Sequence, residues 1–397
     1  MQLDRSLIRD ANWMTPDRAR AYRNVLLVVY ALSILATIIL SHNGLDFYDR
    51  PLGTDFISFW SASKVALSDG PAQAYDVATH WAAQRAAFGG APLNYTAFFY
   101  PPVFLLICLP LGLLPYFWAL ACWLGVTGAL CLRALAWLGR GQVLSVLAFP
   151  AVWTNVMHGQ NGFLTTALFA GAVTCLETRP VHAGVLLGCL IYKPHFLLMV
   201  PVALIAGRRW VTAAAAAGTA VLLCALSAMV LGLDAWRGFL ADSALARAAM
   251  EQDLVGNDKM QSLFAAIRLL GGGLSIAYAA QAALALGVAS VLVRLGRAVP
   301  TGQGTGAALA AAALLTSPFL LVYDLMLLAI PLLWLLRRAG ETGFRPWEKA
   351  VLMAAFILPL VSVEAASFLR LPLAPLGILA VFVLVVRRLR PAPSFAG

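Results

Sequence analysis

One carboxylate stands among aromatic residues early in the chain, in the stretch Gly53-Thr54-Asp55-Phe56-Ile57-Ser58-Phe59-Trp60. Aromatic neighbours that partly shield an aspartate from water raise its proton affinity, and such a group can serve as a general base. Asp55 is therefore a candidate to remove a proton from a hydroxyl group. The alternative interpretation is that Asp55 caps the helix that follows it, and the two roles are compatible.

A lysine interrupts a long apolar run at Lys193-Pro194-His195. A cation at membrane depth is costly unless it meets a cavity or a partner, so such a lysine is a functional candidate. An anionic phosphate would suit it, and Pro194 loosens the helix beside it. The alternatives are a lysine that extends to the membrane surface or one that pairs with an acid.

Three further groups of polar residues are candidates for a functional site. Lys259 and Arg268 follow one another in a polar segment and could grip a phosphate, although an ordinary solvated helix would show the same spacing. Tyr323 and Asp324 follow Ser317-Pro318, where Asp324 is either a member of a buried ion pair or a second site group. Gln160 lies in the polar stretch from Met157 to Gly162, which also reads as a simple turn.

The bulk composition excludes a soluble enzyme. Of 397 residues, 61% are hydrophobic and 12% are charged, against roughly 45–50% and about 25% in soluble domains. A bilayer accepts so much apolar surface, and a spanning helix needs about 20 apolar residues. We therefore predict an all-α polytopic membrane protein that forms a single domain over residues 1–397.

Apolar runs divide the chain into about twelve crossings, with a range of ten to twelve because several runs are short. The runs are 25–41, 100–115, 116–137, 142–157, 160–177, 182–206, 211–233, 273–293, 305–321, 323–336, 349–365 and 372–387. If the N-terminus is cytoplasmic, this count puts on the inner face the basic clusters Arg208-Arg209, Arg294 with Arg297, Arg337 to Lys349 and Arg387 to Arg390. Arg133 and Arg140 are exceptions, and the turn at 157–162 falls inside.

Two segments are too long and polar to be simple connections, about 42–99 and about 234–272, and both fall on the outer face. They hold ten of the 18 acidic residues, and long loops of this kind usually serve binding or catalysis. In the first we expect helices that lie along the membrane surface, over Phe56 to Leu67 and Tyr75 to Phe88.

The net charge of +10 does not indicate nucleic acid, because the bases stand in short loop clusters. The cysteines lie in apolar runs without paired spacing, and the histidines lack metal spacing, so we expect neither a metal nor a cofactor. The chain has no Walker A, G-x-G-x-x-G, H-E-x-x-H or G-x-S-x-G sequence. Without a nucleotide site, a substrate carried by a lipid suits the architecture.

Six short motifs occur in the order seen in glycosyltransferase family 87, which this chain resembles. They are Asp55-Phe56-x-x-Phe59-Trp60-x-Ala62, Ala72-x-x-x-Asp76, Tyr100-Pro101-Pro102, His158-Gly159-Gln160-Asn161, Gly188-x4-Lys193-Pro194 and Ser317-Pro318. The resemblance covers about residues 53 to 330. Many members carry a histidine shortly after Ser-Pro; here Tyr323 or Asp324 would replace it.

The resemblance implies a GT-C type multi-helix bundle whose periplasmic loops carry interfacial helices. It also implies an inverting hexosyltransferase of the bacterial inner membrane, with mannose as the expected sugar. The donor would be a polyprenyl-phosphate sugar and the acceptor an envelope lipid or glycan, bound among membrane lipids on the periplasmic face. Asp55 would be the catalytic base, Lys193, Lys259 and Arg268 would bind the donor phosphate, and substrate contacts would come from Trp60, Tyr100, Gln160, Tyr323 and Asp324.

Two other classes of protein share parts of this pattern. A transporter or flippase of lipid-linked sugars would also place a lysine in the membrane, but it should show symmetric halves, and the sequence has no internal repeat. An O-antigen polymerase or ligase would place its large loop later in the chain, whereas here the first loop is the longest.

Overall fold

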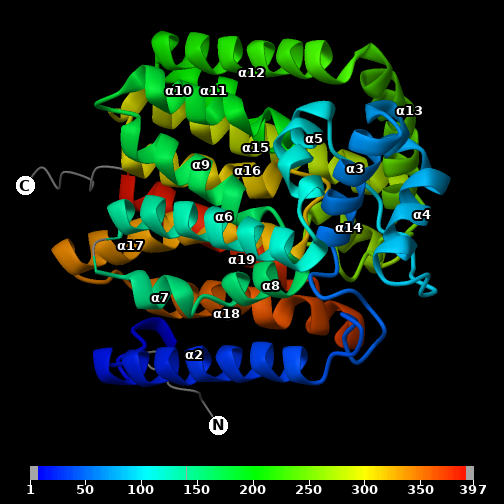
Figure 1. The fold of residues 1–397 in the computed structure, drawn as a ribbon. Coiled ribbons are helices and arrows are strands. Elements are labelled where there is room, and N and C mark those ends of the chain that lie inside the picture. The colour runs from blue at the N-terminus through cyan, green and yellow to red at the C-terminus, as the bar shows by residue number, and fades with distance from the viewer. Residues whose placement is uncertain (1–7, 140, 390–397) are drawn as a thin grey trace, which may run out of the picture.

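The computed structural model describes residues 8–139 and 141–389, and its regular elements there are all helices (Figure 1). Five are long and apolar enough to cross a membrane: α2 (Pro16–Ile39), α6 (Tyr116–Leu138), α12 (Trp210–Leu231), α15 (Leu274–Ala298) and α18 (Glu348–Leu369). Their outer faces are apolar and exposed; on α12, Leu222 is 65% and Met229 83% exposed. Such a surface needs lipid as its solvent, so the predicted all-helical membrane protein is supported.

Shorter helices complete the body of the bundle. α16 (Gln303–Thr316) runs through its centre, where almost every residue is buried, and its alanines and glycines let neighbouring helices approach closely. The others are α7 (Val143–Leu147), α8 (Pro150–His158), α9 (Gly162–Cys175), η5 (Val322–Leu328), α17 (Ala329–Thr342) and α19 (Leu373–Leu389).

Arginines gather at one end of the bundle. The Arg337 guanidinium donates to the carbonyl of Leu138 at 3.4 Å, which joins the last turns of α17 and α6. Arg337 also lines a cavity with Gln303, at the start of α16. Arg209, before α12, donates to the carbonyl of Thr301 at 2.9 Å, which brings the start of α12 to the end of α15. We call this the basic end; it holds the basic clusters at 208–209, 294–297 and 337–349.

The two long polar segments meet at the opposite end, which we call the loop end (Figure 1). The first forms α3 (Phe56–Ser68), η1 (Pro71–Tyr75) and α4 (Val77–Ala87), and the second forms α13 (Leu233–Glu251) and α14 (Leu263–Leu269). α3 and α4 thus lie close to the two helices that were predicted for the first segment, whereas α13 was not predicted.

The first of these helices was predicted to lie along the membrane surface, and the structure shows that it is covered by protein. Ten of the 13 residues of α3 are buried, under α4, η1 and the segment that follows Tyr100. Its serines satisfy their hydroxyl groups inside the protein: Ser58 donates to the Ala97 carbonyl at 2.8 Å, and Ser63 to the Cys108 carbonyl at 2.8 Å. The mixture of aromatic and polar residues therefore reflects an internal helix.

The apolar run at 100–115 does not cross the bundle. It forms α5 (Pro102–Cys108) and η2 (Leu109–Leu113), and both of its ends contact the loop end. The Tyr75 hydroxyl donates to the Tyr100 carbonyl at 3.1 Å, while the Trp60 indole donates to the Leu114 carbonyl at 2.9 Å. The run therefore enters and returns on the same side, because prolines interrupt it at both ends and in the middle.

The run at 182–206 turns back in the same way, but from the basic end. It is divided into α10 (Pro180–Gly188), η3 (Cys189–Tyr192), η4 (Pro194–Leu197) and α11 (Val200–Ala206). α10 packs along the first half of α12, where Gly188 lies against Ala216 and Thr219, and α11 returns so that Gly207 contacts Gly296 near the end of α15. Lys193 stands at the apex of this hairpin.

These two hairpins leave ten of the twelve apolar runs, within the described residues, as candidate crossings. That is the lower limit of the predicted range. Because the first run turns back instead of crossing, residues 116 to 181, which lie between the two hairpins, have the opposite orientation to the one predicted. Arg133 accordingly belongs to the basic end and is no exception, while Arg140 lies outside the described residues. The turn at 157–162 lies at the loop end, whereas the twelve-crossing count placed it on the same side as the basic clusters.

Candidate active site

Asp55 lies half-buried at the loop end, at the start of α3. Its side chain makes no capping hydrogen bond to that helix, so the carboxylate is free for other partners. Its backbone N–H donates to the His158 carbonyl at 2.9 Å. The turn at 157–162 thus fixes the position of Asp55, although it comes about a hundred positions later in the chain.

Gln160 is the residue of that turn that contacts the carboxylate. Its amide Nε2 donates to Asp55 Oδ2 at 3.0 Å, and its Oε1 accepts from the Asn161 backbone N–H at 3.0 Å. The Thr54 hydroxyl lies 3.4 Å from Asp55 Oδ1, beyond good hydrogen-bonding distance. One carboxylate oxygen is therefore fixed, and the other keeps its capacity to accept a proton.

The close contact between this turn and α3 requires a glycine. Gly159 has a φ of +65°, and a Cβ there would come within 2.5 Å of the Phe56 Cβ. Any side chain would therefore force the turn away from Asp55.

Two tyrosines surround Gln160. The Tyr100 hydroxyl points to Gln160 Oε1 at 3.5 Å, and its ring packs against Phe104 with centroids 4.4 Å apart. The Tyr323 ring lies 6.1 Å from the His158 ring, and its backbone carbonyl accepts from Asn155 Nδ2 at 2.9 Å. Aromatic faces beside a carboxylate are suited to contact a sugar ring.

Lys193 and Asp324 form an ion pair directly beneath the tyrosines. Lys193 Nζ lies 2.6 Å from Asp324 Oδ1, and both side chains are 4% exposed. The ammonium group also stands 5.6 Å from the Tyr323 ring centroid and 5.5 Å from that of Phe196. An ammonium has three donors, and the carboxylate uses one of them. The lysine therefore has an acid partner and still has two N–H groups directed elsewhere.

The structure thus brings together six of the predicted residues: Asp55, Tyr100, Gln160, Lys193, Tyr323 and Asp324. Trp60 lies close by in sequence but serves the fold. It is 9% exposed, its indole N–H donates to the Leu114 carbonyl, and its ring packs edge-on against Tyr116 at 5.8 Å.

Lys259 and Arg268 lie apart from this group. Lys259 is exposed on the second loop. The Arg268 guanidinium donates to the carbonyls of Gly272 and Glu251 at 3.0 and 3.3 Å, and it lines a separate cavity with Asp258 and Arg370. The loop contacts the segment before Tyr323 through Gln261, whose backbone N–H donates to the Leu320 carbonyl at 2.7 Å. Met260 and Phe264 also belong to an apolar cluster against which Phe319 and Leu321 pack.

Asn155, Asn161 and His195 belong to the site, but the sequence did not single them out as site residues. Asn161 is fully buried, and among the described residues neither its amide oxygen nor its amide nitrogen has a hydrogen-bond partner; the same holds there for Asn155 Oδ1 and His195 Nε2. Such unpaired groups at a buried position favour a polar ligand. The available signal was that these polar residues stand within apolar sequence. The predicted topology placed the turn with Asn161 on the side opposite to Asp55, so it gave no reason to include Asn161 in the site.

The chemistry of this arrangement follows from its layers. A half-buried carboxylate with one fixed oxygen lies at the loop end, aromatic rings and unpaired amides lie near it, and the Lys193 cation is buried beside Tyr323. This set can bind a polar substrate, accept a proton and stabilise an anion.

Comparison with known protein families gave a match. The model of glycosyltransferase family 87 matches residues 98–322, more than half of the chain. The match includes Tyr100, Gln160 and Lys193, whereas Asp55 precedes it and Tyr323 and Asp324 follow it directly. No curated protein and no solved structure matches the chain.

Proposed function

Since the chain belongs to glycosyltransferase family 87, we propose that this membrane glycosyltransferase moves a hexosyl residue from a polyprenyl-phosphate sugar to an envelope lipid or glycan. The proposed sugar is mannose. The observation that carries the proposal is the combination of a half-buried Asp55, held by Gln160, with a buried cation at Lys193. The family match favours a transferase over a transporter.

In the proposed reaction, Asp55 accepts the proton of an acceptor hydroxyl through the oxygen that Gln160 leaves free. The hydroxyl oxygen then forms a bond to the anomeric carbon of the donor. The bond between that carbon and the phosphate oxygen breaks, and polyprenyl phosphate leaves on the opposite face. One displacement of this kind inverts the anomeric configuration.

The leaving phosphate gains negative charge as the bond breaks, so a nearby cation stabilises the transition state. We assign this role to Lys193, whose remaining N–H groups are not used by Asp324. The proposal gives Lys259 and Arg268 no part in binding this phosphate, because they lie apart from the site. Tyr100, Gln160 and Tyr323 are the proposed sugar contacts, with Asp324 positioning the lysine.

The distribution of arginines supports an orientation in the membrane. Lys and Arg accumulate on the cytoplasmic side of short loops, so we place the basic end and the N-terminus in the cytoplasm. The loop end with Asp55 then faces the periplasm of a bacterial inner membrane. A polyprenyl-phosphate donor would reach it from within the bilayer.

The test uses membranes that contain the full chain, supplied with a radiolabelled polyprenyl-phosphate hexose and a membrane acceptor extract. We expect Asp55→Asn to reduce transfer of label at least about a hundredfold, since general base catalysis contributes about 10²–10⁴. Asp69→Asn is the matched control, because Asp69 lies in the same segment and is exposed. Undiminished transfer by Asp55→Asn at equal expression would refute the proposal.

A further inference from the structure

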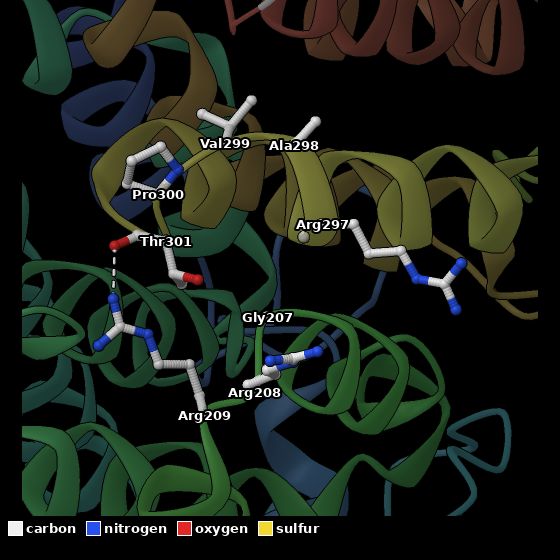
Figure 2. A pocket seen from close by; sticks show the side chains of 9 residues that line it. Gly207, Arg208, Arg209, Arg297, Ala298, Val299, Pro300 and Thr301 are labelled. Atoms are coloured by element: carbon white, nitrogen blue, oxygen red, sulfur yellow. Dashed lines mark hydrogen bonds between the residues drawn. The ribbon is translucent and has the colours of Figure 1, made fainter.

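Another open cavity lies at the basic end, far from Asp55, and the proposed reaction makes no use of it. Its volume is about 500 Å³, and it is lined by Gly207, Arg208, Arg209, Gly296, Arg297, Ala298, Val299, Pro300 and Thr301. Figure 2 shows the turn between α11 and α12 on one side and the last turn of α15 on the other. We call it the arginine pocket.

Three arginines line this pocket, and none of them is paired with a carboxylate within the described residues, although the Glu177 carboxylate lies beside Gly302, the residue after Thr301. Within residues 8–139 and 141–389, no acid lies within 4 Å of Arg208, Arg209 or Arg297, and Arg209 donates only to the Thr301 carbonyl. Other arginines at this end differ: Arg338 pairs with Glu341 and Arg388 with Glu348. Positive charges that line one pocket and are not paired with acids favour binding of an anion.

The backbone holds these charges in place. A Cβ on Gly296 would lie 2.8 Å from the Gly207 nitrogen, so two glycines allow α15 and the end of α11 to touch. Arg208 has a φ of +53°, in the left-handed region that is unfavourable for a residue with a side chain. In Figure 2, the side chains of Arg208 and Arg297 extend toward the same side of the pocket, whereas Arg209 turns to Thr301.

The surface beside the pocket is apolar and exposed. Trp210 is 60%, Val211 55% and Ile205 51% exposed. Tryptophan is enriched where a membrane meets water, and basic pockets between helices at that level bind anionic lipid head groups. A phosphate in the pocket would therefore have room for acyl chains along α12.

We propose that the arginine pocket is a binding site for a phosphate group that carries net negative charge, separate from the catalytic site. The phosphate belongs either to the head group of an anionic phospholipid or to a soluble phosphate compound. Guanidinium groups bind the oxygens of either one in the same way.

The test compares three forms of the full chain purified in detergent. Arg208→Gln with Arg297→Gln removes two pocket charges. Arg179→Gln with Arg294→Gln is the matched control: these arginines are exposed near the same end, do not line the pocket, and remove equal charge. Retention of phosphatidylglycerol is measured against phosphatidylcholine with the same acyl chains by native mass spectrometry, and stabilisation by inorganic phosphate is measured by thermal unfolding.

A lipid site predicts that the parent and the control prefer phosphatidylglycerol, and that the pocket variant loses about tenfold or more of that preference. A site for soluble phosphate predicts that phosphate raises the unfolding temperature of the parent and control only. Either result supports the pocket. The proposal fails if the pocket variant matches the parent in both measurements, or if the control loses as much as the pocket variant. Neither outcome depends on transferase activity.

Discussion

At the scale of single residues, Lys193 and Asp324 depend on each other. Both are buried, and their charged atoms lie 2.6 Å apart. Removing one partner of a buried pair leaves an uncompensated charge and typically costs 3–5 kcal/mol, whereas replacing both can be almost neutral. Single and double replacements at this pair can therefore distinguish its effect on stability from its effect on sugar transfer.

We predict that Lys193→Met and Asp324→Asn each destabilise the protein by about 3 kcal/mol or more, and that the double variant regains most of this loss. The measurement is thermal unfolding in detergent, together with sugar transfer by each variant. The double variant should remain inactive, because the cation that stabilises the phosphate is gone. If the double variant loses as much stability as the two single losses added together, the pair is not coupled; if it transfers sugar normally, Lys193 has no catalytic role.

A second residue, His80 on α4, is buried in its neutral form. Its Nε2 lies 3.0 Å from the Ser58 carbonyl, which can only accept, so this nitrogen carries the proton. Its Nδ1 faces the Tyr95 hydroxyl at 3.3 Å. Burial lowers the pKa of His80 to about 4. A second proton would place a positive charge at this buried position, where the cost of removing it from water opposes protonation.

This pKa gives a pH dependence whose sign follows from proton linkage. The unfolded chain takes up the proton near pH 6.5 and the folded chain only near pH 4, so stability is full above pH 6.5 and falls as the pH is lowered between these values. We predict a loss of about 2 kcal/mol from this group between pH 6.5 and 4.5. His80→Gln should show a shallower fall of unfolding temperature with acid, whatever its stability at pH 7. An unchanged slope would contradict the prediction.

The residue types of the site could be read from the sequence, but their partners could not. Lys193 signalled a need for either a phosphate or an acid, since a bare cation in an apolar run is costly. Nothing local identifies an aspartate 131 positions away as that acid. Trp60 was misjudged for the related reason that an indole N–H looks the same whether it faces a ligand or a distant carbonyl.

At the scale of elements, α10 and α12 are held together by glycines. Cβ atoms built on Gly184 and Gly188 would each lie 2.5 Å from a backbone carbonyl of α12, that of Thr212 and that of Ala216. The contact supports one arm of the hairpin whose apex carries Lys193. A displacement of α10 is therefore expected to move Lys193 and to disturb its ion pair with Asp324.

We predict that Gly188→Ala destabilises the protein by about 1–3 kcal/mol, because the new methyl group must push two helices apart. Gly218→Ala is the matched control: Gly218 lies within α12, and a Cβ there meets nothing within 4 Å. The control should be neutral or slightly stabilising, since alanine favours helix over glycine. Thermal unfolding of both variants in detergent provides the test, and equal unfolding temperatures would show that the helices have space to spare.

The positions of the apolar elements were predictable, but the direction of two of them was not. The runs at 100–115 and 182–206 have the length of a crossing, and length alone does not distinguish a crossing from a hairpin. Prolines were the available signal, at 101, 102, 110 and 115 in the first run and at 194 and 201 in the second. They remove backbone donors at the points where the chain turns.

At the scale of the whole molecule, the two hairpins explain both errors of the predicted topology, the exceptional position of Arg133 and the separation of the turn with Gln160 from Asp55. Each hairpin removes one crossing, so residues between them change sides and residues after them do not. Arg133 joins the basic end and the turn with Gln160 joins Asp55, while all later arginines keep their place. The positive-inside pattern is therefore more regular in the structure than in the twelve-crossing count.

Labelling from one side of the membrane tests this topology directly. Single cysteines are introduced into a variant that lacks the six native ones, at Gln142 and Thr178, which are exposed and lie between the hairpins. Asn94→Cys marks the loop end and Pro346→Cys the basic end. With a membrane-impermeant maleimide on intact cells, we predict that Asn94→Cys reacts, whereas Pro346→Cys, Gln142→Cys and Thr178→Cys react only after the membrane is opened. Twelve full crossings would instead make Gln142→Cys and Thr178→Cys react together with Asn94→Cys. That outcome would be incompatible with a shared location for Asp55 and Gln160, and so with the site itself.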